Sequence, residues 1–188
     1  MNLKVNKDEI DFRKLKEIQT QIDEILEVLI EYLCLHIKNQ INAGADVVQI
    51  FDSWAGLLME KDLSSLCYKP NSKIVKFCKE NNIPSICFPR GIKENYKIFN
   101  EVVSSDGLNL DYKIDPLWAK NNLKNVVLQG GMSPFMLIQG KEKEMYSEAK
   151  KYLDIFKDVP YIFNLGHGLV PETDPANLGK LIKFVREH

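Results

Sequence analysis

Short apolar segments alternate with amphipathic stretches along most of this 188-residue chain. The apolar segments are rich in β-branched and aromatic residues and do not alternate with polar ones, a pattern typical of strands buried on both faces. Between them, apolar residues recur every three or four positions, which predicts helices. The predicted strands are residues 47–51, 83–88, 107–112, 126–129 and 161–165. The predicted helices are residues 59–66, 72–81, 96–103, 116–121, 141–156 and 175–187, with a brief helical turn beginning at 133–134.

A longer helical pattern precedes the first strand. Residues 12–43 contain neither Gly nor Pro, and their apolar residues recur at helical spacing. They predict one long helix or two helices that bend near residues 19–23. Asp11 is a candidate N-cap, and Gly44 fits the position just after a helix end. Residues 1–10 are polar, and we expect them to be frayed.

Strands that alternate with helices indicate repeated βαβ units around a parallel sheet. No Gly-, Ser- or Pro-rich linker and no low-complexity segment interrupts the chain, so we expect a single α/β domain over residues 1–188. About five βα units do not close a barrel of eight, and the first and last strands would be edges with unpaired backbone. We expect either the distal part of a barrel whose other strands come from another polypeptide, or an open sheet in which residues 12–43 cover one edge.

Composition narrows the function classes. Lys plus Arg number 25 and Asp plus Glu 26, so no basic excess favours nucleic acid or an anionic membrane as a partner. The chain opens without an apolar signal region and contains no membrane-length apolar run, so we expect a cytoplasmic protein. The four cysteines form no Cys-x-x-Cys motif, and we expect them to be free thiols in a reducing compartment.

Two segments place polar side chains directly after a predicted strand. His167 lies between two glycines after the strand at 161–165, and Ser53 follows the strand at 47–51. Ligands of parallel α/β folds bind at the carboxyl ends of the strands. Both side chains are therefore candidate ligand contacts.

These two segments also carry a resemblance to a known family. Residues 44–56 read Gly-Ala-Asp-Val-Val-Gln-Ile-Phe-Asp-Ser-Trp-Ala-Gly, and residues 164–175 read Asn-Leu-Gly-His-Gly-Leu-Val-Pro-Glu-Thr-Asp-Pro. In this order and at this separation they resemble the carboxyl-terminal half of uroporphyrinogen decarboxylase. The resemblance implies a (β/α)8 TIM barrel, here incomplete, and a homodimer that uses neither a metal nor an organic cofactor. A complete barrel of this kind usually needs about 250 residues.

The resemblance also implies a reaction in porphyrin and heme biosynthesis. The family converts uroporphyrinogen III to coproporphyrinogen III by decarboxylating its four acetate side chains. Protonation of a pyrrole α-carbon turns the ring into an electron sink, after which the acetate loses carbon dioxide. The protein must therefore supply a proton donor, hold an anionic macrocycle and stabilise positive charge on the ring.

The resemblance assigns substrate-binding roles to two residues of this chain. Ser53 matches the family's strand-end Ser or Thr that hydrogen-bonds the substrate, and His167 matches the histidine at or beside a substrate carboxylate. Arg90 and Lys93, after the second strand, are weaker candidates for attracting an anionic substrate. Asp111 matches the aspartate of the family's Leu-Asp-Trp at a strand end, with Tyr for Trp at the next position.

Other positions depart from the family pattern. Residues 129–134 resemble its Gln-Gly-Asn-x-Asp-Pro, but Gly131 replaces Asn and Ser133 replaces Asp; we expect Ser133 to cap the following turn. We expect Trp54 to be a packing residue. The family's Arg-Gln-Ala-Gly-Arg-Tyr segment, its central aspartate and the supporting tyrosine have no counterpart here. We therefore assign no catalytic residue and expect no decarboxylation by this polypeptide alone.

Two alternatives remain at this point. One is a non-catalytic fragment, or a split-enzyme half that needs an amino-terminal partner. The other is a relative of the zinc-dependent corrinoid methyltransferases, which share the barrel and bind zinc through thiolate and imidazole ligands. Their His-x-Cys motif would fall at Ser85-Ile86-Cys87 and their final Cys at His167. At these three ligand positions the chain therefore has only one thiol, Cys87, and one imidazole, His167.

Overall fold

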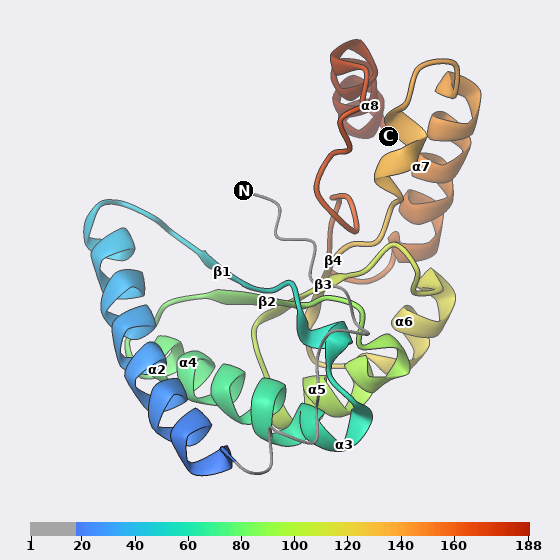
Figure 1. The fold of residues 1–188 in the computed structure, drawn as a ribbon. Helices are drawn as coiled ribbons and strands as arrows, with labels where there is room; N and C mark the ends of the chain where they lie inside the picture. The colour runs from blue at the N-terminus through green and yellow to red at the C-terminus, as the bar shows by residue number, and fades with distance from the viewer. Residues whose placement is uncertain (1–17) are drawn as a thin grey trace.

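A five-stranded parallel sheet organises the computed structural model, which describes residues 18–188. The strands are β1 (Val48–Asp52), β2 (Ser85–Pro89), β3 (Gly107–Leu110), β4 (Val127–Gly130) and β5 (Tyr161–Ile162), and they follow one another in the sheet in chain order. The α-helices are α2 (Gln19–Asn42), α3 (Glu60–Leu63), α4 (Lys69–Glu80), α5 (Tyr96–Val103), α6 (Pro116–Asn122), α7 (Glu142–Phe156) and α8 (Pro175–Glu187). Figure 1 shows the helices as an outer layer around the strands. The predicted parallel α/β architecture is therefore confirmed.

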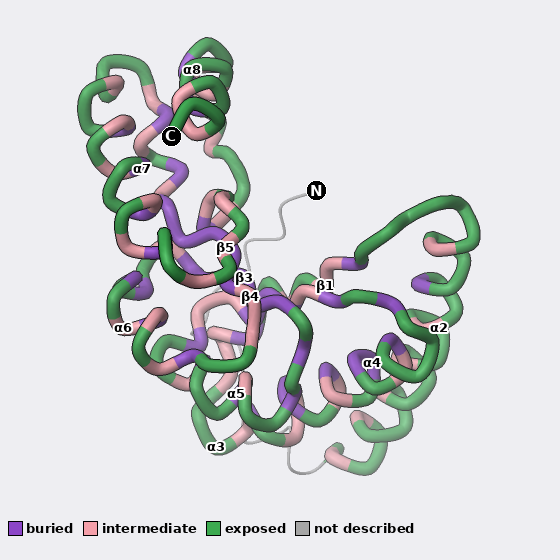
Figure 2. Tube along the Cα trace, turned by 180° about the vertical axis from the view of Figure 1, so that it is seen from behind, coloured by how far each residue is buried: buried purple, intermediate pink, exposed green. Residues whose placement is uncertain are grey.

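The main core lies between the sheet and this outer layer. Its buried members include Phe99 of α5, Leu108 of β3, and Met145 and Phe156 of α7. Figure 2 shows the burial of each residue along the chain, and the buried residues predominate in β2, β3 and β4. The sequences of the strands are apolar because the helices cover one face of the sheet.

Helix α2 confirms the predicted long helix as far as residues 18–188 describe it, and the candidate cap Asp11 lies outside them. Gly44 follows the helix with a φ of 104°, as predicted, and its N–H donates to Ile41. A second core cluster joins Ile37 of α2 to Val48 and to Ile74 of α4. Helix α2 thus packs beside α4 and against Val48 at the start of β1, while Phe51 of the same strand stays exposed.

Two helices predicted at 59–66 and 72–81 are one continuous helical segment. Helix α3 passes into a π-helical turn at Ser64–Tyr68, in which the N–H of Lys69 donates to Ser64, and α4 follows without a break. The structure therefore contradicts two separate helices at these positions. The π-helical turn ends at Tyr68, so Pro70 lies in the first turn of α4, the part of an α-helix that tolerates proline best.

Strand β5 is shorter than the predicted 161–165. Regular pairing with β4 covers only Tyr161 and Ile162, and Leu165 then forms an isolated parallel bridge with Met132. Within residues 18–188, β1 and β5 are the two edge strands, so β5 pairs on one side only. Residues 163–165, three of the five residues of the predicted strand, therefore lie outside the regular sheet.

Side chains from three strands show how strongly the sheet curves. The Gln129 amide of β4 donates to Asn109 of neighbouring β3 at 2.7 Å and to Gln49 of β1 at 3.2 Å. Strands β4 and β1 have two strands between them, which in a flat sheet would put them about 14 Å apart. Their side chains meet only because the sheet curls around a concave face, as in an incomplete (β/α)8 barrel.

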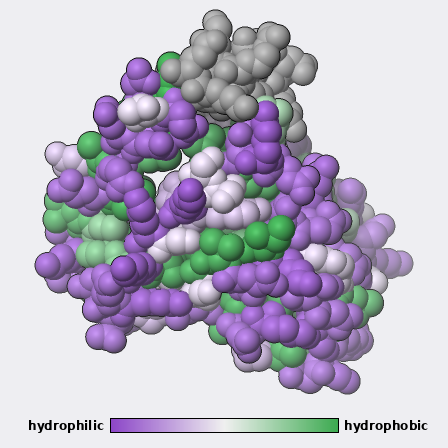
Figure 3. All heavy atoms as spheres, turned by 90° about the horizontal axis from the view of Figure 1, so that it is seen from below, coloured by the Kyte–Doolittle hydropathy of each residue, from purple (hydrophilic) through white to green (hydrophobic). Residues whose placement is uncertain are grey.

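Large hydrophobic side chains remain exposed on both edge strands. Phe51 of β1 is 64% exposed and Ile162 of β5 is 43% exposed. Seen from below, hydrophobic side chains also form a band across an otherwise mostly hydrophilic surface (Figure 3). Among the helices of the described part, none combines the length and hydropathy needed to cross a bilayer.

Candidate functional site

Ser53 lies at the carboxyl end of β1, in a loop that is tied to the end of β2. The strands are in register up to Asp52 and Pro89, and the N–H of Arg90 donates to the Asp52 carbonyl at 3.1 Å. In return, the N–H of Gly56 donates to the Arg90 carbonyl at 2.9 Å. Ser53 and Arg90 are therefore held at neighbouring strand ends by backbone hydrogen bonds.

Two glycines let these loops touch. A Cβ atom on Gly56 would lie 2.7 Å from the Gly91 carbonyl oxygen and 2.8 Å from its Cα. Gly91 itself has a φ of 82°, in the region that favours glycine. The close approach of the two backbones fixes the Ser53 loop against the Arg90 loop.

The half-buried Asp52 carboxyl anchors the same loop from the end of β1. Asn71 of α4 donates to it through Nδ2 at 3.1 Å, and Asn71 also donates to the Cys67 carbonyl at 2.8 Å. Burial raises the pKa of Asp52, while hydrogen bonds from Cys67, Asn71 and the Ala55 backbone oppose that rise. The carboxyl thereby links β1, its loop and the π-helical turn. Sequence patterns gave no sign of this cluster, because it depends on where the unbroken helix runs.

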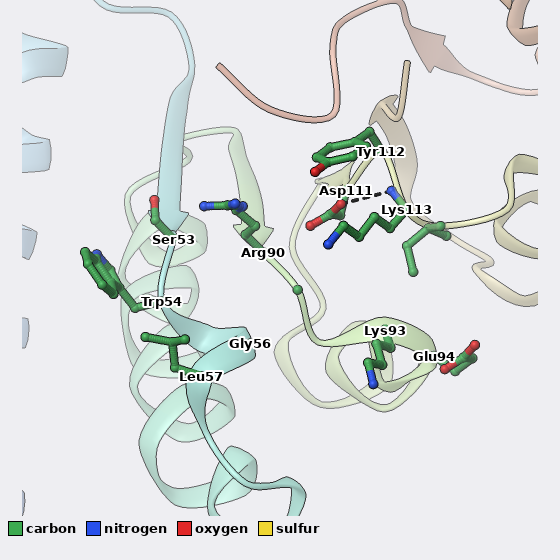
Figure 4. A pocket seen from close by; sticks show the side chains of 12 residues that line it. Ser53, Trp54, Gly56, Leu57, Arg90, Lys93, Glu94, Asp111, Tyr112 and Lys113 are labelled. Atoms are coloured by element: carbon green, nitrogen blue, oxygen red, sulfur yellow. Dashed lines mark hydrogen bonds between the residues drawn. The ribbon is translucent and has the colours of Figure 1, made fainter. Parts of the chain in front are cut away.

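A cavity of about 660 Å³ opens at the ends of β1, β2 and β3. It is lined by Ser53, Trp54, Gly56, Leu57, Arg90, Gly91, Lys93, Glu94, Asp111, Tyr112, Lys113 and Ile114. Figure 4 shows the loop after β1 with Ser53 and Trp54 on one side, the β3 loop with Asp111 and Tyr112 on the other, and Arg90 between them. Three cationic and two anionic side chains line it, so the cavity suits a polar, anionic ligand better than an apolar one.

Asp111 is the buried charged group of this cavity, with 4% of its surface exposed. Its Oδ1 accepts a hydrogen bond from the Lys113 N–H at 2.9 Å, and its own N–H donates to the Tyr96 hydroxyl at 3.2 Å. Burial, and then the charge of Asp111, raise the pKa of Tyr96 far above its ordinary value. The carboxylate therefore orders the β3 loop around the cavity.

His167 lines a second cavity, of about 510 Å³, between the β5 loop and α8. This cavity is mostly apolar, and Arg186 is its other ionisable lining residue. Partial burial lowers the pKa of His167, the charge of Arg90 lowers it further, and the charge of Asp111 opposes the shift. The imidazole is thus favoured in its neutral form near pH 7, with one N–H donor and one acceptor nitrogen.

The two cavities are neighbours. A Cβ atom on Gly166 would lie 2.7 Å from the Tyr112 Cα, so the loop before His167 packs directly on the loop that lines the first cavity. The N–H of Gly166 also donates to the Met132 carbonyl at 2.8 Å. The structure therefore brings Ser53, Arg90 and Asp111 to one cavity and His167 to the adjoining one.

Sequence reasoning missed the polar group on the concave face. Asn109 and Gln129 are 2% and 4% exposed, and they join Gln49 through the hydrogen bonds described above. The available signal was a lone amide within each otherwise apolar strand. Which of these amides meet depends on the curvature of the sheet.

Two local predictions were wrong. Trp54, expected to be a packing residue, is 50% exposed at the rim of the first cavity. Ser133 occupies the N-cap position of the short helix Pro134–Leu137, but its side chain makes no capping hydrogen bond. Gly131, by contrast, fits its site closely, because a Cβ atom there would lie 2.7 Å from the Tyr152 ring.

The two β2 residues proposed for the zinc alternative have other surroundings in the structure. Cys87 is fully buried in the main core, and burial raises the pKa of its thiol to about 12, whereas zinc binds the thiolate. Ser85 instead bonds Asp106, through its N–H at 2.9 Å and its hydroxyl at 3.2 Å. Among residues 18–188, no three His, Cys, Asp or Glu side chains gather as a metal site. All four cysteines are free, as predicted.

Comparison with known proteins defines the family. A methyltransferase from Methanosarcina mazei has a similar fold, with a TM-score of 0.79 over 94% of this chain and 52% of that one, at 23% identity. "Uroporphyrinogen decarboxylase" of Wolbachia pipientis wMel is 37% identical over 169 residues, which are 89% of this chain and 49% of that protein. The same-named protein of Cereibacter sphaeroides (strain ATCC 17025) is 36% identical over 190 residues, 96% of this chain and 54% of that protein.

These curated relatives are about twice as long as the region they share with this chain. The family model for uroporphyrinogen decarboxylase (URO-D) matches residues 12–188, which include both strand-end segments and every residue of the two cavities. The chain therefore belongs to the uroporphyrinogen decarboxylase family.

Proposed function

We propose that this chain forms the carboxyl-terminal part of a uroporphyrinogen decarboxylase. In this proposal residues 1–188 form a single domain, which is the carboxyl-terminal part of the barrel. In this proposal Ser53 and His167 bind the substrate, and the product is coproporphyrinogen III. The observation that carries the proposal is the grouping of Ser53, Arg90 and Asp111 around one cavity at the strand ends of a curved parallel sheet. A cytoplasmic location fits this role.

The chemistry of the two cavities supports this substrate. The Ser53 hydroxyl and a neutral His167 imidazole can each donate a hydrogen bond to a carboxylate. A substrate with eight carboxylates also requires positive charge, and cationic side chains outnumber anionic ones in the lining of the first cavity. In the reaction, a proton adds to the pyrrole α-carbon, the bond to the acetate carboxylate breaks to release carbon dioxide, and its electron pair flows into the protonated ring. The methylene carbon then takes up a proton and becomes a methyl group, and the α-carbon loses the proton that it had gained. None of the residues in the two cavities is assigned as the proton donor.

The remainder of the barrel is the second part of the proposal. The chain spans about half the length of its curated relatives, and the edge strands β1 and β5 leave Phe51 and Ile162 exposed. We propose that further parallel strands pair with these edges, and that the complete enzyme is a homodimer, as the family resemblance implies. Residues on those strands would supply the proton donor and the central anion.

A chimera tests this proposal. The amino-terminal half of the Wolbachia pipientis relative is fused to residues 12–188, and the purified chimera is assayed with uroporphyrinogen under reducing conditions. We expect coproporphyrinogen from the chimera, at least a tenfold lower rate from its Ser53→Ala variant, and no product from the 188-residue chain alone. A chimera that folds, by circular dichroism, but forms no product would contradict the proposal.

A further inference from the structure

We propose that Arg90 is a carboxylate-binding residue, and that with Ser53 and His167 it forms one anion subsite across the two neighbouring cavities. The chemical class of the ligand is a polycarboxylate. Its identity as a uroporphyrinogen rests on the proposed function, but the subsite itself rests on the geometry of these residues. The resemblance assigns a role to Ser53 and His167 and leaves Arg90 as one loop charge among several.

The backbone places Arg90 beside Ser53. Pro89 and Asp52 are the last register pair of β2 and β1, so the next residues on each strand, Arg90 and Ser53, are neighbours across the sheet. The hydrogen bonds from Arg90 to Asp52 and from Gly56 to Arg90 hold both loops. Figure 4 shows the Arg90 guanidinium extending towards Ser53 at the mouth of the cavity.

Burial distinguishes Arg90 from the two lysines of the same cavity. Arg90 is half-buried, whereas Lys93 and Lys113 are exposed. Within the described part of the chain, no carboxylate lies at ion-pair distance from the Arg90 guanidinium. A half-buried guanidinium with unused donors binds a carboxylate in a paired, two-point geometry, and its attraction is screened less than that of an exposed ammonium.

His167 lies within the electrostatic reach of the same guanidinium. Gly166 packs on Tyr112, which brings the imidazole loop against the first cavity. Arg90 lowers the pKa of His167 and Asp111 opposes it, and Arg186 of α8 shares the cavity of His167. A carboxylate bound between the two side chains would neutralise the charge of Arg90 and accept a hydrogen bond from the imidazole of His167. It should therefore raise the pKa of His167.

The first experiment needs no substrate. The chain contains three histidines, so NMR titration of the imidazole resonances follows His167 individually, with assignment by His167→Gln. The variants Arg90→Gln and Lys93→Gln each remove one positive charge from the same cavity. We expect Arg90→Gln to raise the pKa of His167 and Lys93→Gln to leave it within error of the wild type. Equal shifts in both variants, or none in either, would overturn the proposed coupling.

The second experiment measures the subsite with uroporphyrin, the oxidised macrocycle that retains eight carboxylates. Fluorescence titration at 0.15 M salt should show binding at least tenfold weaker for Arg90→Gln and less than twofold weaker for Lys93→Gln. Equal losses would mean that a diffuse positive field binds the ligand, and the proposal would be wrong. An unchanged affinity for Arg90→Gln would also reject it.

A third experiment distinguishes a failure of the proposed function from a failure of the anion subsite. If the wild-type chain binds no uroporphyrin, citrate, a small tricarboxylate, is titrated while the pKa of His167 is followed, with sodium chloride at matched ionic strength as the control. The subsite predicts that citrate raises the pKa of His167 in the wild type and in Lys93→Gln, but not in Arg90→Gln. A citrate effect no larger than the salt effect would overturn the subsite itself.

Discussion

Gly166 packs on the backbone of Tyr112 so closely that a Cβ atom would lie 2.7 Å from the Tyr112 Cα and nearer still to its nitrogen. Gly168, two residues further on, has no atom within 4 Å of the position its Cβ would take. The two glycines that flank His167 therefore have different roles. The first sets the imidazole loop against the β3 loop, and the second leaves space beside the imidazole.

The first prediction compares these two glycines. Gly166→Ala forces two backbones apart, so we expect the free energy of unfolding to fall by about 2 kcal/mol or more, in the range of overpacked cores. Gly168→Ala adds its methyl group to open space and should change it by less than about 0.5 kcal/mol. Urea unfolding of both variants provides the measurement. Similar losses of stability in the two variants would show that the close contact with Tyr112 does not prevent a side chain at position 166.

The second prediction concerns the amides on the concave face. Asn109→Leu removes the acceptor at 2.7 Å from Gln129, a side chain that is 4% exposed, so we expect a loss of about 1–3 kcal/mol. Gln49 is half-buried and accepts the longer hydrogen bond from Gln129, at 3.2 Å. We therefore expect Gln49→Leu to lower the free energy of unfolding by about 1 kcal/mol or less. Denaturant unfolding measures both. A larger loss of stability for Gln49→Leu than for Asn109→Leu would contradict the prediction that the hydrogen bond between Asn109 and Gln129 is the more important one.

The third prediction is a pH dependence at Asp52. Because its folded pKa is raised, the folded state holds the proton more tightly than the unfolded chain, whose carboxyl has a pKa of about 3.9. The stability of the wild type should therefore decrease, relative to Asp52→Asn, as the pH rises from below about 4 through the folded pKa. Above that pKa the difference should be constant.

Chemical unfolding from pH 3.5 to pH 8 measures this difference. The asparagine amide retains an acceptor for Asn71 and the Ala55 N–H, so Asp52→Asn should still fold. Asp46→Asn, at an exposed position just before β1, is the matched control and should follow the wild type across the range. If Asp52→Asn also follows the wild type, burial does not penalise the Asp52 charge.

The fourth prediction concerns His167, whose folded pKa is lowered chiefly by burial. As the pH falls below about 6.5, the unfolded chain binds a proton that the folded chain does not, so the wild type should lose stability relative to His167→Gln. Above about pH 7 the imidazole is neutral in both states, and the difference should not change. Unfolding between pH 5 and pH 8 tests this, with the exposed His36→Gln as the control. A constant difference down to pH 5 would mean that His167 titrates as in the unfolded chain.

Local sequence signals predicted most of the elements because local physics decides them. Helix α5 has the predicted bounds Tyr96–Val103, and α8 begins at the predicted Pro175, where the Asp174 carboxylate accepts a hydrogen bond from the Ala176 N–H at 2.9 Å. Proline at the first helical position and an aspartate before it are start signals that need no tertiary contact. The same local signals did not show that residues 60–80 form one continuous helical segment with a π-helical turn at Ser64–Tyr68.

The sequence by itself determined the parallel α/β class, the family and the location of Ser53 and His167 after strands, since periodicity and strand-end motifs are properties of adjacent residues. The tertiary structure decided which side chains meet. Arg90 lies beside Ser53 because β1 and β2 are in register, and Gln129 reaches Gln49 because the sheet curls. Such contacts join residues that are distant in the chain. Their formation depends on strand order, register and curvature, which the pattern within any single segment does not contain.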